Sequence, residues 1–367
     1  MNRNKHNISS TPLENPTPDY EAARVVFEDT SYENGKAVSA QTSTFDITTD
    51  VTPVEREISL EQLDREVHQI GKTAIETFML RSDNTNEDNR KLFTVFMGWG
   101  GNAETDIARL ELANIQAAHP DSDILLVNNP GSGESSPLER KTARELRRTG
   151  DFRAVGNLYA EILQPYIDKA SEVTLYGHSE GALSAIGATA ALHDRVDHLV
   201  AVDAPGSRKL GVIGLMKAFM MREGKHVQQY QEHSQNPYAL EKQRENDANM
   251  VKNLRAMGWR GVKQQFIDHT IAMGKSNLEA QLTNAAESMK ENGDITYVSP
   301  ELSELSNQEA VSGILGRVSR LHQDNPAKYP RIHVSERVMK EATHAIVLTN
   351  PTLFQAWTKP AEWNTDT

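Results

Sequence analysis

Short apolar runs alternate with amphipathic segments along most of the chain, and this alternation limits the possible folds more than any other feature. Helical patterns occur at 104–118, 138–149, 153–169 and 180–193. The runs with strand character around them are 74–80, 92–97, 124–127, 173–176, 198–202, 295–298 and 332–334. Strands that alternate with helices form βαβ units. We therefore predict an α/β fold with a mostly parallel central sheet flanked by helices.

The remaining segments define the domain organisation. Residues 1–20 are polar and proline-containing, and we expect a flexible N-terminal arm. Asn34-Gly35 separates two strand-like runs, a pattern typical of a β-hairpin, which should add antiparallel strands at one edge of the sheet. Residues 59–70 have a helical pattern. The predicted core therefore consists of residues 21–205 and 294–367.

Between the two parts of the core, residues 206–293 are almost entirely helical in pattern and carry no strand signal. A connection this long within a compact domain indicates a separate helical cap. Its segment 212–221 is rich in methionine, a flexible side chain that adapts to varied apolar shapes. This segment either forms the packing face of the cap or lines an apolar pocket.

Composition excludes several classes of function. The chain has 367 residues and a net charge of -12, which disfavours a nucleic-acid partner. No window approaches the roughly 20 apolar residues of a membrane span, and the N-terminus has no apolar leader, so we expect a cytoplasmic protein. Cysteine is absent, and the 12 histidines are scattered without metal-ligand spacing. We therefore expect no metal and no cofactor.

The segment 173–185 carries the chemistry. An apolar strand leads into Gly177-His178-Ser179-Glu180-Gly181, and a helix of small residues follows. A strand that turns directly into a helix strains the backbone of the turn residue and raises its side chain above the sheet. The two glycines allow strand and helix to approach closely. Ser179 would then lie at a helix N-terminus, where a developing oxyanion is stabilised.

This G-x-S-x-G segment, in its strand–turn–helix setting, resembles the nucleophile elbow of the α/β-hydrolase family. The resemblance covers residues 74–205 and 294–357, and it implies a helical lid inserted after the sixth strand. After the third strand the family usually has His-Gly-x, and here Met97 replaces the histidine before Gly98-Trp99. By resemblance, the backbone N–H groups of Trp99 and Glu180 form the oxyanion hole. Asn128–Ser135 resembles the family's Asp-x-Pro-Gly-x-Gly-x-Ser segment, with a structural role.

The general base should be a histidine, because its side chain titrates near neutral pH. The family order is serine, acid, histidine, and His344 follows the last predicted strand, ahead of a segment that resembles the family's closing Pro-x-x-Phe. His333 lies within that strand and should face the core or a helix. His178 should point away from Ser179 and pack structurally.

Three carboxylates are candidates for the acid that orients the histidine. The family's commonest acid follows the seventh strand as Gly-x-x-Asp, but this chain has no aspartate there. Glu304 stands at the acid position of a variant motif and is our first choice. Asp203, at the end of the sixth strand, is the alternative, and Glu301 is the third candidate.

These features predict a serine hydrolase that cleaves an ester or similar carbonyl substrate, a small and partly apolar molecule, through an acyl-enzyme. The alternatives on the same fold are acyl transfer, carbon–carbon bond hydrolysis and cofactor-free peroxide chemistry. A further alternative is a noncatalytic protein that binds a ligand or acts as a scaffold.

Overall fold

The structure is a computed structural model that describes residues 24–46, 54, 57–82, 90–225, 241, 245, 259, 261–344 and 353–358. The predicted N-terminal arm, residues 1–20, lies outside the described residues, as does most of the middle of the predicted cap.

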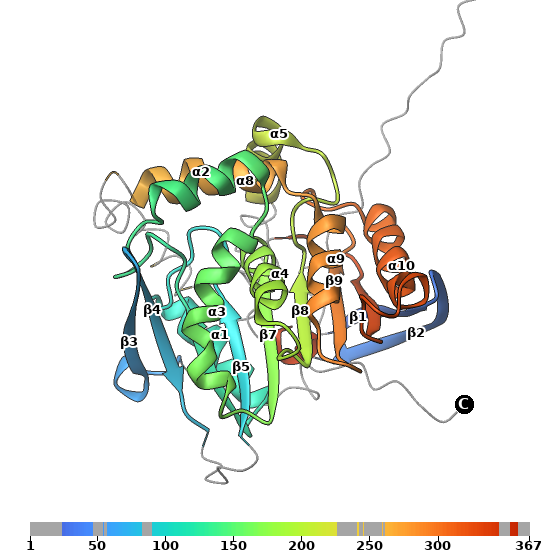
Figure 1. Cartoon of the computed structure of the whole chain (residues 1–367), viewed down its shortest axis with the longest axis horizontal. Coiled ribbons are helices and arrows are strands. Elements are labelled where there is room, and N and C mark those ends of the chain that lie inside the picture. The colour runs from blue at the N-terminus through green and yellow to red at the C-terminus, as the bar shows by residue number, and fades with distance from the viewer. Residues whose placement is uncertain are drawn as a thin grey trace, which may run out of the picture.

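A single ten-stranded sheet runs through the molecule in the order β2-β1-β10-β9-β8-β7-β5-β6-β4-β3 (Figure 1). Its strands are β1 (Arg24–Glu33), β2 (Lys36–Asp46), β3 (Asp64–Ile70), β4 (Thr73–Leu80), β5 (Lys91–Phe96), β6 (Ser122–Val127), β7 (Glu172–His178), β8 (His198–Val202), β9 (Asp294–Pro300) and β10 (His333–Met339).

The centre of the sheet, from β6 to β10, is parallel, and both edges are antiparallel. This confirms the predicted mostly parallel sheet, and each predicted strand overlaps an observed one. In a parallel sheet the carboxyl ends of the strands share one edge, where ligands bind in open α/β folds. The loops after β5, β6, β7, β8, β9 and β10 therefore meet at one end of the molecule.

The β1–β2 hairpin forms as predicted. Asn34 and Gly35 both have positive φ, 53° and 83°, as a tight two-residue hairpin turn requires. β1 pairs antiparallel with β10, which places the hairpin at one edge of the sheet.

The helix predicted over residues 59–70 is wrong. Only Leu60–Gln62 form a short 3-10 turn (η1), and Asp64–Ile70 form the edge strand β3. The side chains of β3 are mostly exposed. An edge strand with two solvated faces lacks the polar–apolar alternation that identifies a half-buried strand, so its charged residues look like those of a surface helix.

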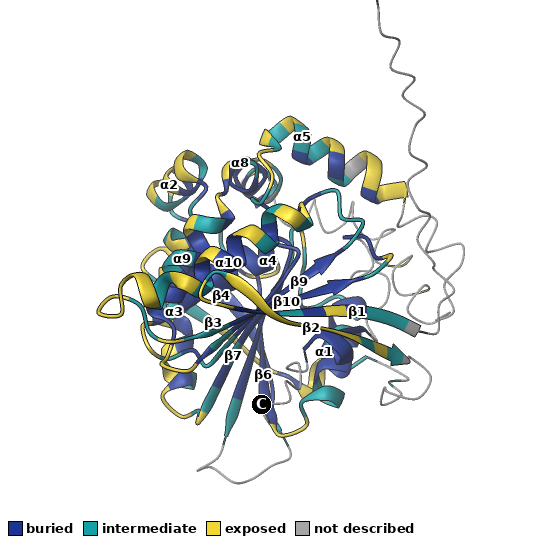
Figure 2. Ribbon diagram, turned by 90° about the vertical axis from the view of Figure 1, so that its right-hand side faces the viewer, coloured by how far each residue is buried: buried dark blue, intermediate teal, exposed yellow. Residues whose placement is uncertain are grey.

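Helices cover both faces of the sheet and also its carboxyl end (Figures 1 and 2). On one face α3, α4, α9 and α10 pack side by side, and on the other α1 packs against α12. The inward faces are buried and the outward faces exposed. The helices are α1 (Asp106–Ala118), α2 (Arg140–Thr149), α3 (Arg153–Ile167), α4 (Glu180–Leu192), α5 (Gly211–Lys217), α8 (His269–Lys275), α9 (Leu278–Ser288), α10 (Gln308–Asp324) and α12 (Phe354–Trp357).

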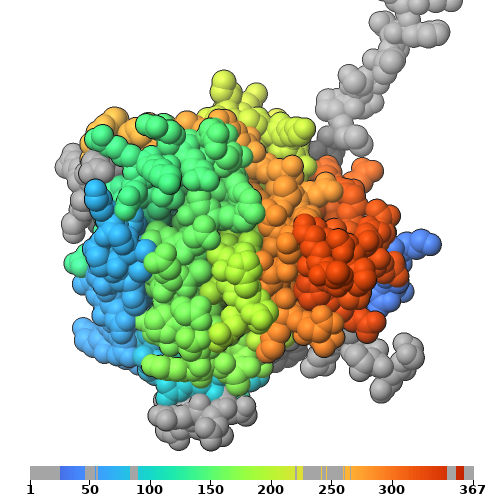
Figure 3. Space-filling view, viewed as in Figure 1, coloured from blue at the N-terminus to red at the C-terminus, as the bar shows by residue number. Residues whose placement is uncertain are grey.

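Over the carboxyl end lie α2, α5 and α8 (Figures 1 and 3). The π-helices η3 (Ala218–Glu223) and η4 (Gln264–Asp268) continue into this layer from α5 and α8. We call α5, η3, η4 and α8 the cap helices. They fall inside the predicted cap, residues 206–293, but α9 does not behave as cap, because it packs against α4 in the helix layer of the core.

No helix in the described part of the chain is both long and apolar enough to cross a bilayer.

Candidate active site

Ser179 alone separates β7 from α4. Its backbone angles are φ 59° and ψ -121°, a strained conformation for a residue with a side chain. A Cβ on Gly177 would lie 2.1 Å from the carbonyl oxygen of Gly181, and a Cβ on Gly181 would lie 2.1 Å from that of Phe96. Strand, turn and helix are therefore packed so closely that only glycine fits at either position. The predicted strand–turn–helix is present.

His344 lies beyond the end of β10 and is 1% exposed. Its Nδ1 is 2.6 Å from Oδ2 of Asp203, which is completely buried at the end of β8. The same Oδ2 accepts a hydrogen bond from Ser303 Oγ at 2.6 Å. Within the described residues, the buried Nε2 of His344 has no hydrogen-bond partner. An imidazole held by a carboxylate at Nδ1 leaves Nε2 available to exchange a proton.

The ring of His344 also locates it relative to the elbow. It stacks on His178, the residue before Ser179, with ring centroids 4.4 Å apart. It also contacts Phe219 edge-on at 6.0 Å, and Phe219 lines the same pocket as Ser179. Burial, and next the nearby His344, hold the pKa of His178 well below its usual range, so His178 is a neutral packing partner.

The structure does not bring the first-choice acid to His344. Glu304 does not contact His344: its carboxylate lies 2.5 Å from the Arg222 guanidinium on η3, and its N–H donates to Glu223. Glu301 pairs with Lys340 at 2.5 Å. In the loop after β9, Ser303 is the residue whose side chain reaches the His344–Asp203 pair. The next residue, Glu304, is directed to Arg222 of the cap. Of the three candidate carboxylates, Asp203 is therefore the one that contacts the imidazole of His344.

The loop after β5 carries Trp99, which lines the pocket beside Ser179. Two asparagines after β6 hold this loop. Asn129 Nδ2 donates to the carbonyls of Met97 and Gly98 at 3.0 and 2.9 Å, and Asn128 Oδ1 accepts from the N–H of Ala103 at 2.8 Å. The segment Asn128–Ser135 therefore has the predicted structural role, because the side-chain amides of Asn128 and Asn129 hold the loop after β5. The aspartate usual at this position would lack the N–H donors that Asn128 directs to Glu76.

The pocket at Ser179 is small and apolar. The cap supplies Leu215, Met216 and Phe219 from the methionine-rich segment, and Thr270 and Met273 from α8. Its volume is about 10 Å³, close to that of one water. Trp99 packs edge-on against Phe219 and Phe266, each at 5.0 Å. The segment therefore both packs and lines the pocket, since Leu215 and Ala218 are buried in the core cluster while Leu215, Met216 and Phe219 line the pocket.

One pair near the elbow was not anticipated from the sequence. The carboxylate of Glu180, the residue after Ser179, contacts Nδ1 of His269 of α8, and both side chains are fully buried. His269 Nε2 lies 3.3 Å from Gln264 Nε2, and Gln264 bonds the carbonyl of Pro130. Burial, and next the Glu180 charge, raise the pKa of Tyr159. The elbow is thus joined to the cap through buried polar contacts.

Within the described residues no group of three histidine, aspartate or glutamate side chains is placed to hold a metal ion.

No family model matches the sequence, and no curated protein matches it. Many solved structures do resemble the fold. A lipase-like protein from Acinetobacter baumannii AYE, described as a putative lipase, superimposes with a TM-score of 0.50 at 13% identity, covering 81% of this chain and 90% of the other. An α/β hydrolase enzyme from a Medee basin deep-sea metagenome library gives 0.49 at 13% identity, covering 82% and 100%. Proline iminopeptidase of Mycobacterium smegmatis gives 0.48 at 13% identity, covering 80% and 95%.

At these identities the likeness concerns the fold alone. The strand order, the parallel centre and the helices on both faces agree with it. This chain has the α/β-hydrolase fold.

Proposed function

We propose that the protein is a serine hydrolase that cleaves an ester or a similar carbonyl substrate through an acyl-enzyme. Ser179 is the nucleophile, His344 the general base and Asp203 the acid that orients it. The chemistry uses side chains of this chain only, and the substrate is a small, partly apolar molecule.

The observation that carries the proposal is the 2.6 Å contact between His344 Nδ1 and Asp203 Oδ2 beside a strained serine. A carboxylate at Nδ1 keeps the proton there, which leaves Nε2 as the acceptor for the serine hydroxyl proton. The imidazolium that forms is stabilised by the Asp203 charge. It then returns the proton to the leaving group, and a water repeats the sequence on the acyl-enzyme.

Charge on the carbonyl oxygen needs donors that are already in place. The backbone N–H of Glu180 is the first of α4, and that of Trp99 belongs to the loop that Asn129 holds. We assign the oxyanion hole to these two groups. They require no side-chain chemistry, so Met97 in place of the usual histidine does not impair them.

Labelling with a fluorophosphonate tests the proposal, because the probe reacts only with an activated serine. We expect one label per chain, recovered on the peptide that contains Ser179, and hydrolysis of p-nitrophenyl acetate or butyrate. Ser179→Ala should abolish labelling and lower kcat/KM by about 10³-fold or more. Ser171→Ala is the matched control, since Ser171 is exposed and lies just ahead of β7.

A chain that folds and does not label would exclude an activated serine and overturn the proposal. Labelling on Ser179 without ester hydrolysis would retain the nucleophile but exclude a simple esterase. Product analysis with an added alcohol or amine acceptor would then separate hydrolysis from acyl transfer.

A further inference from the structure

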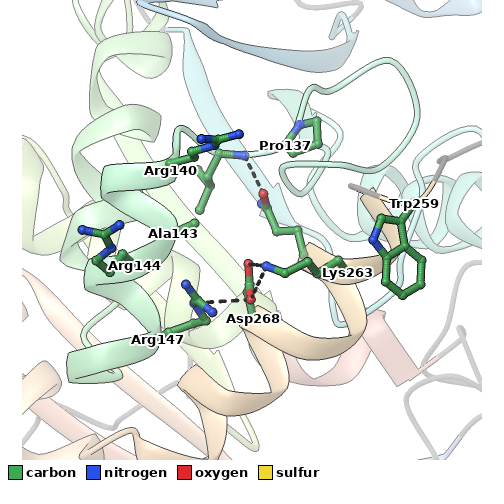
Figure 4. Close-up of a pocket in the computed structure, with 10 residues that line it drawn as sticks. Pro137, Arg140, Ala143, Arg144, Arg147, Trp259, Lys263 and Asp268 are labelled. Carbon is green, nitrogen blue, oxygen red and sulfur yellow. Dashed lines mark hydrogen bonds and ion pairs between the residues drawn. The ribbon is translucent and has the colours of Figure 1, made fainter.

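A second pocket lies where α2 meets the cap helices η4 and α8 (Figure 4). Its volume is about 340 Å³, within the range of small-ligand sites. Its wall on the α2 side carries Arg140, Arg144 and Arg147, and its cap side carries Lys263 and the indole of Trp259. It is distinct from the pocket at Ser179, with which it shares no lining residue.

The charges that line this pocket are only partly compensated. Asp268 is 3% exposed and forms ion pairs with Arg147 at 3.4 Å and Lys263 at 3.2 Å. No contact joins Arg140 or Arg144 to an acidic side chain among the described residues, and both are exposed (Figure 4). One carboxylate therefore faces four cationic groups, in a protein whose net charge is -12.

This arrangement is unfavourable for α2 by itself. Arg140 and Arg144 are four residues apart, as are Arg144 and Arg148, and like charges at that spacing repel each other on a helix surface. The repulsion lowers the stability of α2, and the helix nevertheless presents guanidinium groups on the pocket side. An anion bound between them would relieve the repulsion.

We propose that this pocket binds a phosphate monoester. A phosphoryl group carries close to two negative charges at neutral pH and three acceptor oxygens, which match the fork-shaped donors of several arginines. A single carboxylate would leave more of the positive charge uncompensated. Leu138 and Ala143 are buried beneath the arginines, and the Trp259 side chain is 73% exposed at the rim. These apolar surfaces suit the organic part of the ester.

The pocket also lies on the junction between core and cap. Gln264, on its cap wall, accepts the N–H of Leu138 at 2.6 Å and contacts His269, the partner of Glu180. A phosphate held between Arg144 and Lys263 would join α2 to the start of η4, so the bound ester would stabilise the contact between core and cap helices.

Isothermal titration with phenyl phosphate and with inorganic phosphate tests the site at low salt. We expect the wild-type protein to bind both, with phenyl phosphate tighter. Arg140→Gln combined with Arg144→Gln should weaken both by about tenfold or more. Trp259→Ala should weaken phenyl phosphate only. Arg148→Gln is the matched control, since it removes the same charge from α2 outside the pocket.

The same phosphoryl group could come from a lipid, and sedimentation with phosphatidylcholine vesicles that contain phosphatidic acid separates the sources. Binding to the vesicles alone, lost in the double arginine variant, would support the site with a lipid headgroup as its ligand. Failure to bind either soluble phosphate or vesicles would overturn the proposal. Equal weakening by Arg148→Gln would overturn it too, because it would reduce the site to general charge attraction. The melting temperature of the double variant without ligand should not fall.

Discussion

At the scale of single residues, the carboxylate that contacts His344 shows what a sequence motif can and cannot locate. Asp203 and Glu304 both follow strands at the carboxyl end of the sheet, so either could reach a histidine there. The choice depends on a turn: Ser303 bonds the Asp203 carboxylate, and the following residue is directed toward Arg222. No residue pattern specifies which of two adjacent loop positions points inward.

Amide variants distinguish the two carboxylates. Asp203→Asn should lower kcat by about 10²–10⁴-fold, because the amide cannot stabilise the imidazolium and favours the wrong tautomer. Glu304→Gln removes a partly exposed ion pair with Arg222, which is worth at most about 1 kcal/mol, and should leave kcat within about tenfold of wild type. Esterase kinetics and melting temperatures are measured for both. The reverse order of losses would return the acid to the loop after β9.

The buried Glu180–His269 pair should couple the elbow to the cap. Removing one member leaves an unpaired buried polar or charged group, so Glu180→Gln or His269→Asn alone should each cost about 3–5 kcal/mol of unfolding free energy. The double variant should cost clearly less than the sum of the two. Urea unfolding of the four proteins gives the coupling energy directly. Additive losses would show that the two side chains act independently.

At the scale of elements, the best-predicted features were those with strong local signals. The Asn34-Gly35 turn and the glycine-flanked serine each require one backbone geometry, and the buried strands are continuous apolar runs. β3 was missed because its charged, exposed residues carry no such signal. The α9 segment was assigned to the cap because its amphipathic pattern shows one apolar face but not which surface covers it.

The two glycines of the elbow differ from a glycine in an ordinary helix. Gly181→Ala places a methyl group 2.1 Å from the Phe96 carbonyl oxygen, a rigid backbone atom, and should destabilise the fold by about 1–3 kcal/mol or more while displacing Ser179. Gly313→Ala on α10 is the matched control. Its nearest neighbour is an arginine side chain at 3.5 Å, so alanine should stabilise the helix by about 0.5–1 kcal/mol. Thermal melts and fluorophosphonate labelling are the measurements; an active, stable Gly181→Ala protein would contradict the close-packed elbow.

At the scale of the whole molecule, the two ends of the sheet carry different polar groups. The end opposite Ser179 holds His198, whose Nδ1 is 2.6 Å from Asp294 and whose Nε2 is 3.5 Å from Glu172. Burial alone would lower the pKa of His198. The hydrogen bonds to the two carboxylates outweigh burial and raise the pKa to about 10. His198 is therefore protonated in the folded protein well above its usual range.

This shift makes stability depend on pH in a defined direction. The folded state keeps the His198 proton between about pH 6.5 and 10, whereas the unfolded chain has lost it. The contribution of His198 to the free energy of unfolding is complete below about pH 6.5 and is lost as the pH rises toward 10. Urea unfolding at pH 6 and pH 9.5 should show a larger alkaline loss for wild type than for His198→Gln. His68→Gln is the control, because burial lowers the pKa of His68, so its removal should not reduce the alkaline loss.

The pairing of β1 with β10 sets the order in which the molecule can be completed. Asp29 and Arg337 form a buried ion pair across this contact although they lie 308 residues apart in sequence. A two-stranded hairpin is marginal by itself, so β1 and β2 must wait during synthesis for a strand that comes much later in the sequence. His344 follows that strand by only a few residues. The segment that carries Ser179 is therefore synthesised well before His344, so the proposed nucleophile has no proposed base until the strand that pairs with β1 has been made.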